Sequence, residues 1–132
     1  MQNAIACIRG DGIRGIVRFR PRCQGVLITA EIFGLSDGFH GFHIHEGADC
    51  GGKDFSNTGV HFGTGDHPDH AGDLPPLLSG NGRACLSVLT NRLQMEDILG
   101  RTVVIHNLSD DFRTQPAGDS GKKIACGRII SC

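Results

Sequence analysis

Hydrophobic and polar residues alternate along much of this chain, as they do in strands that bury one face. This alternation, with many β-branched residues, predicts short strands near 3–9, 14–20, 26–33, 39–45, 83–89, 102–106 and 124–130. Glycine-rich segments 10–12 and 79–82 predict tight hairpin connections, and 34–38 predicts a slightly longer hairpin. One short segment, 93–99, predicts a helix. The pattern therefore predicts an all-β fold.

Two connections between the predicted strands are long, at about 46–73 and about 107–123. In a compact domain, long irregular loops are usually functional or are held by something other than a core. We therefore expect these two segments to be functional or to be fixed by other means.

The length of 132 residues corresponds to a single domain that spans 1–132. The formal net charge is −1 and no run of basic residues occurs, so neither nucleic acid nor an anionic membrane surface is expected as a partner. No stretch approaches the ~20 apolar residues that span a bilayer, and the first residues do not resemble a signal peptide. We expect a soluble chain with a small partner.

Histidines are concentrated in the stretch GFHGFHIHE at 38–46. On a strand, Phe42 and Ile44 can face the core while His43 and His45 project together from the other side. Polar residues on the solvated face of a strand would give the same pattern, so an isolated His-x-His is weak evidence for a site. Here the chain offers further candidate ligands outside the strand, which are His61, His67, His70, Asp73 and His106.

Imidazole suits copper and zinc. Three imidazoles with one carboxylate form a plausible tetrahedral zinc set, whereas four imidazoles without a thiolate suit a tetragonal Cu(II). The sequence therefore predicts a metal site on the outer wall of the barrel, beneath a long loop.

Several motifs of the chain occur in a fixed order, and they are GDG at 10–12, GFHGFHIHE at 38–46, HAGDL at 70–74, GRTVVIH at 100–106, DD at 110–111 and ACG at 125–127. In this set the chain resembles the copper/zinc superoxide dismutases over essentially its whole length. The resemblance implies an eight-stranded Greek-key β-barrel or flattened sandwich, with copper and zinc bound on its outer face under the two loops.

The resemblance also implies the ligands. The copper ligands would be His43, His45, His61 and His106, and the zinc ligands would be His61, His67, His70 and Asp73. His61 would then bridge the two metals. Asp110 would link a copper histidine to a zinc histidine through hydrogen bonds, His40 would be a structural hydrogen-bonding group, and Asp111 would be an ordinary loop residue.

A disulfide between Cys50 and Cys126 is likewise implied by the resemblance, with Cys50 placed as in the bacterial enzymes. We interpret Cys7 and Cys85, which lie in apolar strands, as small buried hydrophobic residues. Cys23 and Cys132 match no role in the family, and each is expected to be a free thiol or to pair.

The implied activity is the conversion of superoxide to oxygen and hydrogen peroxide by Cu(II)/Cu(I) cycling, in which His61 releases copper and gains a proton while zinc holds its ring. Lys123 stands where the family has an arginine at the mouth of the site, and we expect it to steer the anion. The alternative is that Lys122 or another cation supplies this field.

Three further questions stay open. A non-catalytic copper- and zinc-binding relative is an alternative to the enzyme, and a copper-only variant is a third possibility that His70 and Asp73 argue against. A homodimer is possible. The chain as given predicts a cytoplasmic protein, whereas the expected disulfide favours an exported protein whose signal has been removed.

Overall fold

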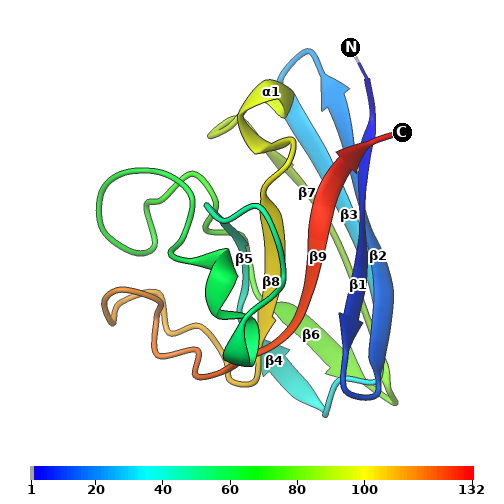
Figure 1. Cartoon of the computed structure of the whole chain (residues 1–132), viewed down its shortest axis with the longest axis vertical. Coiled ribbons are helices and arrows are strands. Elements are labelled where there is room, and N and C mark those ends of the chain that lie inside the picture. Colours follow the sequence, from blue (N-terminus) through cyan, green and yellow to red (C-terminus); the bar gives the residue numbers. More distant parts are fainter. Residues whose placement is uncertain (1) are drawn as a thin grey trace.

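The computed structural model describes residues 2–132 and places nine antiparallel strands in one sheet (Figure 1). The strands are β1 (Ala4–Gly10), β2 (Ile13–Arg22), β3 (Gly25–Phe33), β4 (Gly38–His40), β5 (Phe42–His45), β6 (Leu77–Gly80), β7 (Arg83–Thr90), β8 (Thr102–His106) and β9 (Lys123–Ser131). Two short helices interrupt the loops, η1 (Lys53–Thr58) and α1 (Met95–Ile98). The order across the sheet is β4-β6-β7-β3-β2-β1-β9-β8-β5. The all-β prediction is confirmed.

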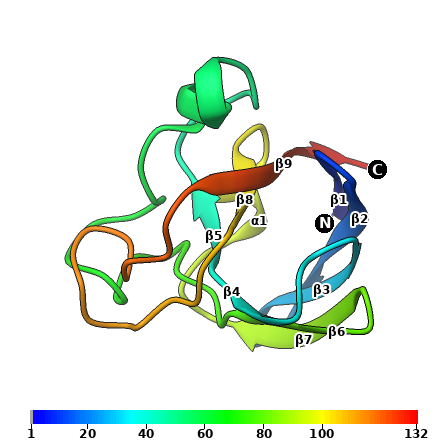
Figure 2. The same cartoon turned by 90° about the horizontal axis from the view of Figure 1, so that it is seen from below.

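The predicted strand 39–45 is divided at Gly41 into β4 and β5, which lie at opposite ends of the strand order. β4 pairs with β6, and β5 pairs with β8. A Cβ atom at Gly41 would lie 2.5 Å from the Ser120 hydroxyl oxygen, so a side chain does not fit there. Because β4 and β5 are consecutive in the chain, this break curls the sheet into a nearly closed barrel (Figure 2). This division and β6, which none of the predicted ranges covers, account for nine strands where the pattern predicted seven and the resemblance implied eight.

The predicted hairpin connections are confirmed in two cases and wrong in one. β1 pairs with β2, and β6 pairs with β7 through a turn in which Asn81 and Gly82 both have positive φ. Segment 34–38 does not form a hairpin, because β3 pairs with β2 and β7 whereas β4 pairs with β6. That segment instead crosses from one part of the barrel to another.

Inward-facing residues of the strands form one apolar core, with fully buried side chains that include Phe19, Ile28, Ile32, Phe42 and Ile44. The burial alternates along β1 and β3, as the sequence pattern predicted, whereas β5 and β8 are buried along their whole length.

The predicted burial of Cys7 and Cys85 is wrong, because both are exposed. In β1 the neighbours Ala6 and Ile8 fill the core, so the side chain between them points outward. The hydrophobic residues around each cysteine belong to the opposite face of the strand.

The two long loops lie together on one side of the barrel, the side of β5 and β8 (Figures 1 and 2). The first joins β5 to β6 and the second joins β8 to β9. Among residues 2–132, no helix is long and apolar enough to cross a membrane.

Candidate metal centre

Six histidines converge where the two long loops cover β5 and β8. His43 and His45 come from β5, and His106 ends β8, the neighbouring strand. The first loop runs back along β5, with isolated bridges that pair His43 with Asp73 and His45 with His61. The loops bury the outer face of β5, so His43 and His45 are as inaccessible as the core residues Phe42 and Ile44 of the same strand.

Four of these rings form a first set, His43, His45, His61 and His106, which we call the copper set after the metal that the resemblance assigns to them. One nitrogen from each ring lies within 4.8 Å of the others. Within residues 2–132, the buried side-chain nitrogens without a hydrogen-bond partner are His43 Nδ1, His45 Nε2, His61 Nε2, His67 Nδ1 and His106 Nε2. The copper set supplies all of these except the nitrogen of His67.

The other nitrogen of each ring in the copper set is occupied, which fixes the tautomer. His45 Nδ1 donates to the Gly59 carbonyl at 2.9 Å, and His106 Nδ1 to that of Gly121 at 3.2 Å. His43 Nε2 donates to Asp110 Oδ2 at 2.8 Å. In each of these neutral rings the remaining nitrogen is a lone-pair donor that faces the cluster.

A second set consists of Asp73 and the three rings around its carboxylate, which are His61, His67 and His70. We call it the zinc set after the metal that the resemblance assigns to these residues. The carboxylate oxygens lie 2.6 Å from His61 Nδ1, 3.2 Å from His67 Nδ1 and 2.9 Å from His70 Nδ1. The contacts of His61 and His70 are shorter than the about 3.3 Å that separates donor atoms on one tetrahedral zinc, so these rings are hydrogen-bonded to the carboxylate here. What matches a zinc set is the combination of three imidazoles with one carboxylate. His43 also approaches His61, His67 and Asp73 within 4.8 Å, which shows how closely the two sets adjoin.

His61 belongs to both sets. Its Nδ1 contacts Asp73 and its Nε2 is one of the unpaired nitrogens of the copper set. The ring centroids of His61 and His43 are 4.0 Å apart. The two nitrogens of His61 thus face different sets, and its role as a bridge stays a prediction.

Asp110 joins the two sets from the second loop. Its Oδ2 accepts from His43 Nε2 at 2.8 Å and its Oδ1 from His67 Nε2 at 2.7 Å. Burial raises the pKa of this carboxyl, but the hydrogen bonds from the two rings and from the Phe112 N–H outweigh it, and the pKa lies well below its usual range. Asp110 is thus an anion that orients one ring of each set.

Two further predicted residues, His40 and Asp111, take part in hydrogen bonds outside the metal sets. His40 Nδ1 lies 2.9 Å from the His106 carbonyl oxygen and Nε2 lies 2.8 Å from that of Ser36, so the backbone holds the ring outside both metal sets. Asp111 is exposed and its carboxylate caps the following turn through Thr114.

Three histidines of the copper set, His43, His45 and His106, have lowered pKa values. Burial lowers the pKa of His45 to about 2 and that of His106 to about 3, and the charge of Lys123 contributes to both. Burial also lowers the pKa of His43, against the opposing effect of Asp110. Because metals bind the neutral ring, these side chains need lose no proton at neutral pH to act as ligands.

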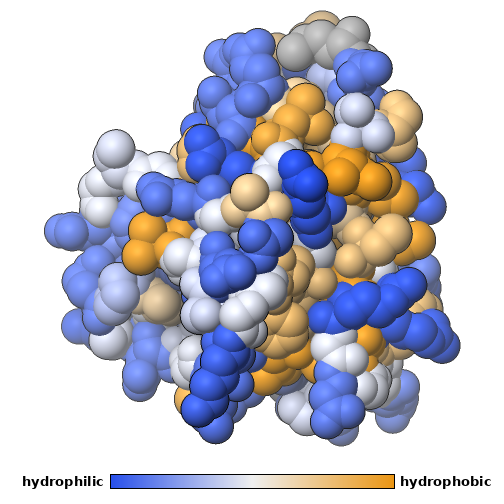
Figure 3. Space-filling view, viewed as in Figure 1, coloured by the Kyte–Doolittle hydropathy of each residue, from blue (hydrophilic) through white to orange (hydrophobic). Residues whose placement is uncertain are grey.

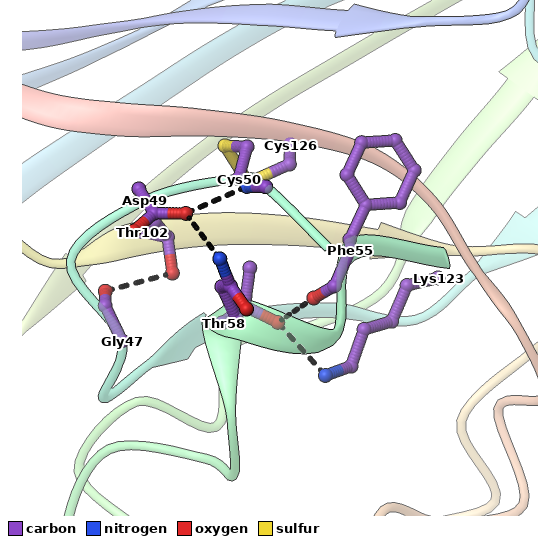
Figure 4. Close-up of a disulfide and its surroundings, with 10 residues drawn as sticks. Gly47, Asp49, Cys50, Phe55, Thr58, Thr102, Lys123 and Cys126 are labelled. Atoms are coloured by element: carbon purple, nitrogen blue, oxygen red, sulfur yellow. Dashed lines mark hydrogen bonds between the residues drawn. A yellow bond between two sulfur atoms is a disulfide. The ribbon is translucent and has the colours of Figure 1, made fainter. Parts of the chain in front are cut away.

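Lys123 lies at the start of β9 beside the copper set. Its ammonium donates to the Thr58 hydroxyl at 2.8 Å (Figure 4). It also donates to the Gly59 carbonyl at 2.9 Å, the same carbonyl that accepts from His45. Burial lowers its pKa. The side chain therefore holds η1 against β9 as well as bringing a positive charge to the site.

The predicted disulfide is present. Cys50, in the loop that leads to η1, is bonded to Cys126 in β9, with Cα atoms 5.8 Å apart (Figure 4). The other cysteines are free and exposed in the part of the chain that the structure describes, and they are Cys7, Cys23, Cys85 and Cys132. The covalent bond thus fixes the metal-binding loop to the last strand.

Sequence reasoning missed three residues that support the zinc set. Arg92 Nη1 donates to the Pro68 carbonyl at 2.9 Å and contacts that of His70 at 3.4 Å. The Gln115 amide both donates to and accepts from the backbone of His67. Gly118 has φ of +70°, and a Cβ there would lie 1.9 Å from Asp110 Oδ1. No spacing signal could have found them, because each acts through the backbone or through the absence of a side chain.

We expect Arg92→Gln to weaken zinc binding about tenfold while copper binding changes little. The reason is that the guanidinium holds the carbonyls of Pro68 and His70, which lie in the segment that carries the two zinc-set histidines of this loop. Competition with a chromogenic chelator measures both affinities. Arg22→Gln is the matched control, since that guanidinium contacts only the carbonyl of its neighbour Pro21. Equal zinc affinities in the two variants would show that Arg92 does not position the loop.

The fold and the paired sets define a β-barrel protein with adjoining sites for two metal ions. The family model described as copper/zinc superoxide dismutase (SODC) matches residues 13–129. The chain is 38% identical to Superoxide dismutase [Cu-Zn] of Deinococcus radiodurans, over 87% of this chain and 76% of that protein. It is 34% identical to the Copper chaperone for superoxide dismutase of Rattus norvegicus, over 96% of this chain and 52% of that protein.

Among solved structures, the clock protein EA4 superposes with a TM-score of 0.90 at 31% identity, covering 99% of this chain and 95% of that one. The family match spans most of the chain, and the relatives agree with it in fold and sequence. The chain belongs to the copper/zinc superoxide dismutase family.

Proposed function

We propose that the protein is a superoxide dismutase, which converts two superoxide anions and two protons into oxygen and hydrogen peroxide with copper and zinc as its metals. The observation that carries this is the convergence of four buried, unpaired imidazole nitrogens next to a carboxylate-centred set that shares His61. Family membership supports the same activity. The similarity to a copper chaperone is weaker in identity and covers about half of that protein.

In this proposal copper is held by His43, His45, His61 and His106, and zinc by His61, His67, His70 and Asp73. The first assignment is supported by the unpaired nitrogens, and the second by the three Nδ1 atoms that surround one carboxylate. A set of four imidazoles suits copper, and three imidazoles with a carboxylate suit zinc.

Bound copper supplies the electron transfer, because it can accept an electron from one superoxide and give it to the next. His61 would be the residue that handles a proton, because its Nδ1 lies against Asp73 and its Nε2, which faces the copper set, would be free to take up a proton when copper does not occupy it. Asp110 keeps the rings of His43 and His67 in one orientation throughout. The protein's residues thus supply fixed geometry and a proton-carrying nitrogen.

The proposal is tested by loading the protein with copper and zinc and following superoxide decay by stopped flow. We expect fast decay that is first order in enzyme and is abolished when copper is removed with a chelator. A loaded protein with full copper content and no activity would identify a non-catalytic metal-binding relative instead.

We also propose that Lys123 steers superoxide toward the copper set. Its charge is close enough to influence His45 and His106, and it lies in a strand that borders the second loop. A lysine offers a single point of charge where an arginine would offer a planar fork, so steering should be retained better than docking. Lys122, its exposed neighbour, is the competing source of the field.

Lys123→Glu is expected to lower the rate constant of superoxide decay about tenfold or more and to reverse its dependence on salt, whereas Lys123→Arg changes it modestly and upward. Lys122→Glu is the matched control, because it changes the net charge equally at an adjacent exposed position. Copper content is measured in every variant, since Lys123 shares the Gly59 carbonyl with His45. Rates and salt slopes that do not differ among these proteins would remove Lys123 from the mechanism.

The compartment and the oligomeric state stay predictions. The sequence predicts a cytoplasmic location, with an exported mature protein as the alternative, and allows a homodimer. Fractionation of cells and analytical ultracentrifugation test them directly.

A further inference from the structure

Charge is strongly segregated between the strands and the rest of the molecule. Among all residues assigned to strands within 2–132, Glu31 is the single acidic residue. The same strands carry a set of cations, which are Arg9, Arg14, Arg18, Arg20, Arg22, Arg83, Lys123 and Arg128. A chain with a net charge of −1 therefore presents a basic sheet surface, with its acidic residues in the loops, turns and short helices.

Three of the arginines line one hollow of about 330 Å³ on the outer face of β1, β2 and β3. Arg9, Arg14 and Arg18 share this groove with Cys7, Thr29 and Glu31. On the face seen in Figure 3, strongly hydrophilic residues lie beside hydrophobic ones over β9 and β1. The volume lies within the range of small-ligand sites.

The positive charge of this groove is not neutralised by its neighbours. Arg9 and Arg14 lie directly opposite each other in the register of β1 and β2, and like charges in such a pair cost stability. Glu31 is already engaged, because Arg83 Nε donates to its carboxylate at 3.0 Å. The fold itself gains nothing from the pairing of Arg9 with Arg14, so an anionic ligand is the natural explanation.

The guanidinium groups are also oriented. Arg14 lies over the ring of Phe33, 5.0 Å from its centroid, and Arg9 Nη1 donates to the Ile8 carbonyl at 3.0 Å. Arg14 and Arg18 are four residues apart on one strand, which separates their Cα atoms by about 13 Å. A ligand that contacts both therefore needs more than one anionic group.

The groove is separate from the metal centre. β1, β2 and β3 lie toward the middle of the strand order, whereas β5 is at one end with β8 beside it. Both views place these three strands across the barrel from the two long loops (Figures 1 and 2). A ligand bound in the groove would contact none of the residues that surround the metals.

We propose that this groove is a binding site for a soluble ligand that carries several phosphate groups. Arginine pairs with phosphate through two parallel hydrogen bonds, and the three guanidiniums, two of which are oriented, can engage successive phosphates of one chain. The Thr29 hydroxyl adds a further donor within the same hollow. The site is independent of superoxide chemistry.

The test uses the metal-loaded protein with inorganic triphosphate as the probe. Cys7 lines the groove, whereas Cys85 is an exposed thiol of β7 outside it, so the two thiols report site and background in one experiment. Triphosphate should slow alkylation of Cys7 by iodoacetamide in a saturable way and leave the rate at Cys85 unchanged. Orthophosphate should need an at least about tenfold higher concentration for the same protection. Metal content is checked afterwards, because triphosphate also chelates metals.

The variants Arg14→Gln and Arg18→Gln should each weaken this protection about tenfold, whereas Arg22→Gln, on the same strand but beyond the groove, should not. All three should retain the superoxide decay rate of the unaltered protein. Equal slowing of Cys7 and Cys85, no protection at all, or an equal loss in Arg22→Gln would each overturn the proposal. Sedimentation with phosphatidylglycerol vesicles that triphosphate does not compete would assign the surface to a membrane and would also overturn it.

Discussion

Replacing His61 with alanine is expected to lower the rate constant of superoxide decay at least about a hundredfold and to weaken both metal sites at once. The reason is that His61 contributes one nitrogen to each set, Nδ1 beside Asp73 and Nε2 among the copper rings. Metal competition gives the two affinities, and the visible absorption of Cu(II) reports the coordination at copper.

His70→Ala is the matched control for this experiment, because His70 contacts the Asp73 carboxylate and does not belong to the copper set. It should weaken zinc binding and leave the copper spectrum nearly unchanged. If His61→Ala preserved both the copper spectrum and the zinc affinity, the bridging assignment would be wrong. A change in zinc affinity alone would restrict His61 to the zinc set.

The histidines could be predicted because the residue type identifies a metal ligand and the spacing places two of them on one face of a strand. Period-two alternation placed His43 and His45 on one face of a strand, and the structure keeps them there with Phe42 and Ile44 in the core. The ligands in the first loop follow no strand periodicity, so their spacing alone predicts no relative positions. Their positions indicated that they could converge, whereas the assignment of each residue to copper or zinc followed only from the resemblance. In the structure the convergence depends on the bridges that the first loop forms along β5.

The errors in the fold share one physical cause, which is that neighbouring residues do not report which strands become partners. A glycine-rich segment at 34–38 has the composition of a hairpin, but the pairing of β3 with β7 and of β4 with β6 is decided by contacts distant in sequence. The split at Gly41 depends in the same way on Ser120, a residue of the other loop.

The misplacement of Cys7 and Cys85 has a different origin. Cysteine is apolar enough to be counted with the core residues, so hydropathy alone gives no alternation across Ala6, Cys7 and Ile8. The register of β1 against β2 settles the face, since it pairs Cys7 with the partly exposed Ile16 and Ala6 with the buried Val17. The pairing of the strands therefore shows which face each residue occupies, and the amino-acid composition does not.

The disulfide has the largest expected effect on stability. It joins Cys50 to Cys126 across a sequence separation of 76 residues, so breaking it releases a long loop in the unfolded chain. In the chain-entropy account, a closure of this length stabilises the folded state by about 4 kcal/mol. The bond also fixes the loop near η1, where Thr58 and Gly59 accept hydrogen bonds from Lys123.

The double variant Cys50→Ser, Cys126→Ser is therefore expected to lower the free energy of unfolding of the metal-free protein by about 4 kcal/mol, measured by urea denaturation without reductant. The matched control is Cys23→Ser, Cys132→Ser, which removes two exposed free thiols and should leave the midpoint nearly unchanged. Copper affinity should also fall in the first variant, because the Gly59 carbonyl that orients His45 lies in the released loop. Coincident unfolding curves for the two double variants would mean that the hydrogen bonds of Lys123 and the packing of η1 on β9 hold this loop without the covalent bond.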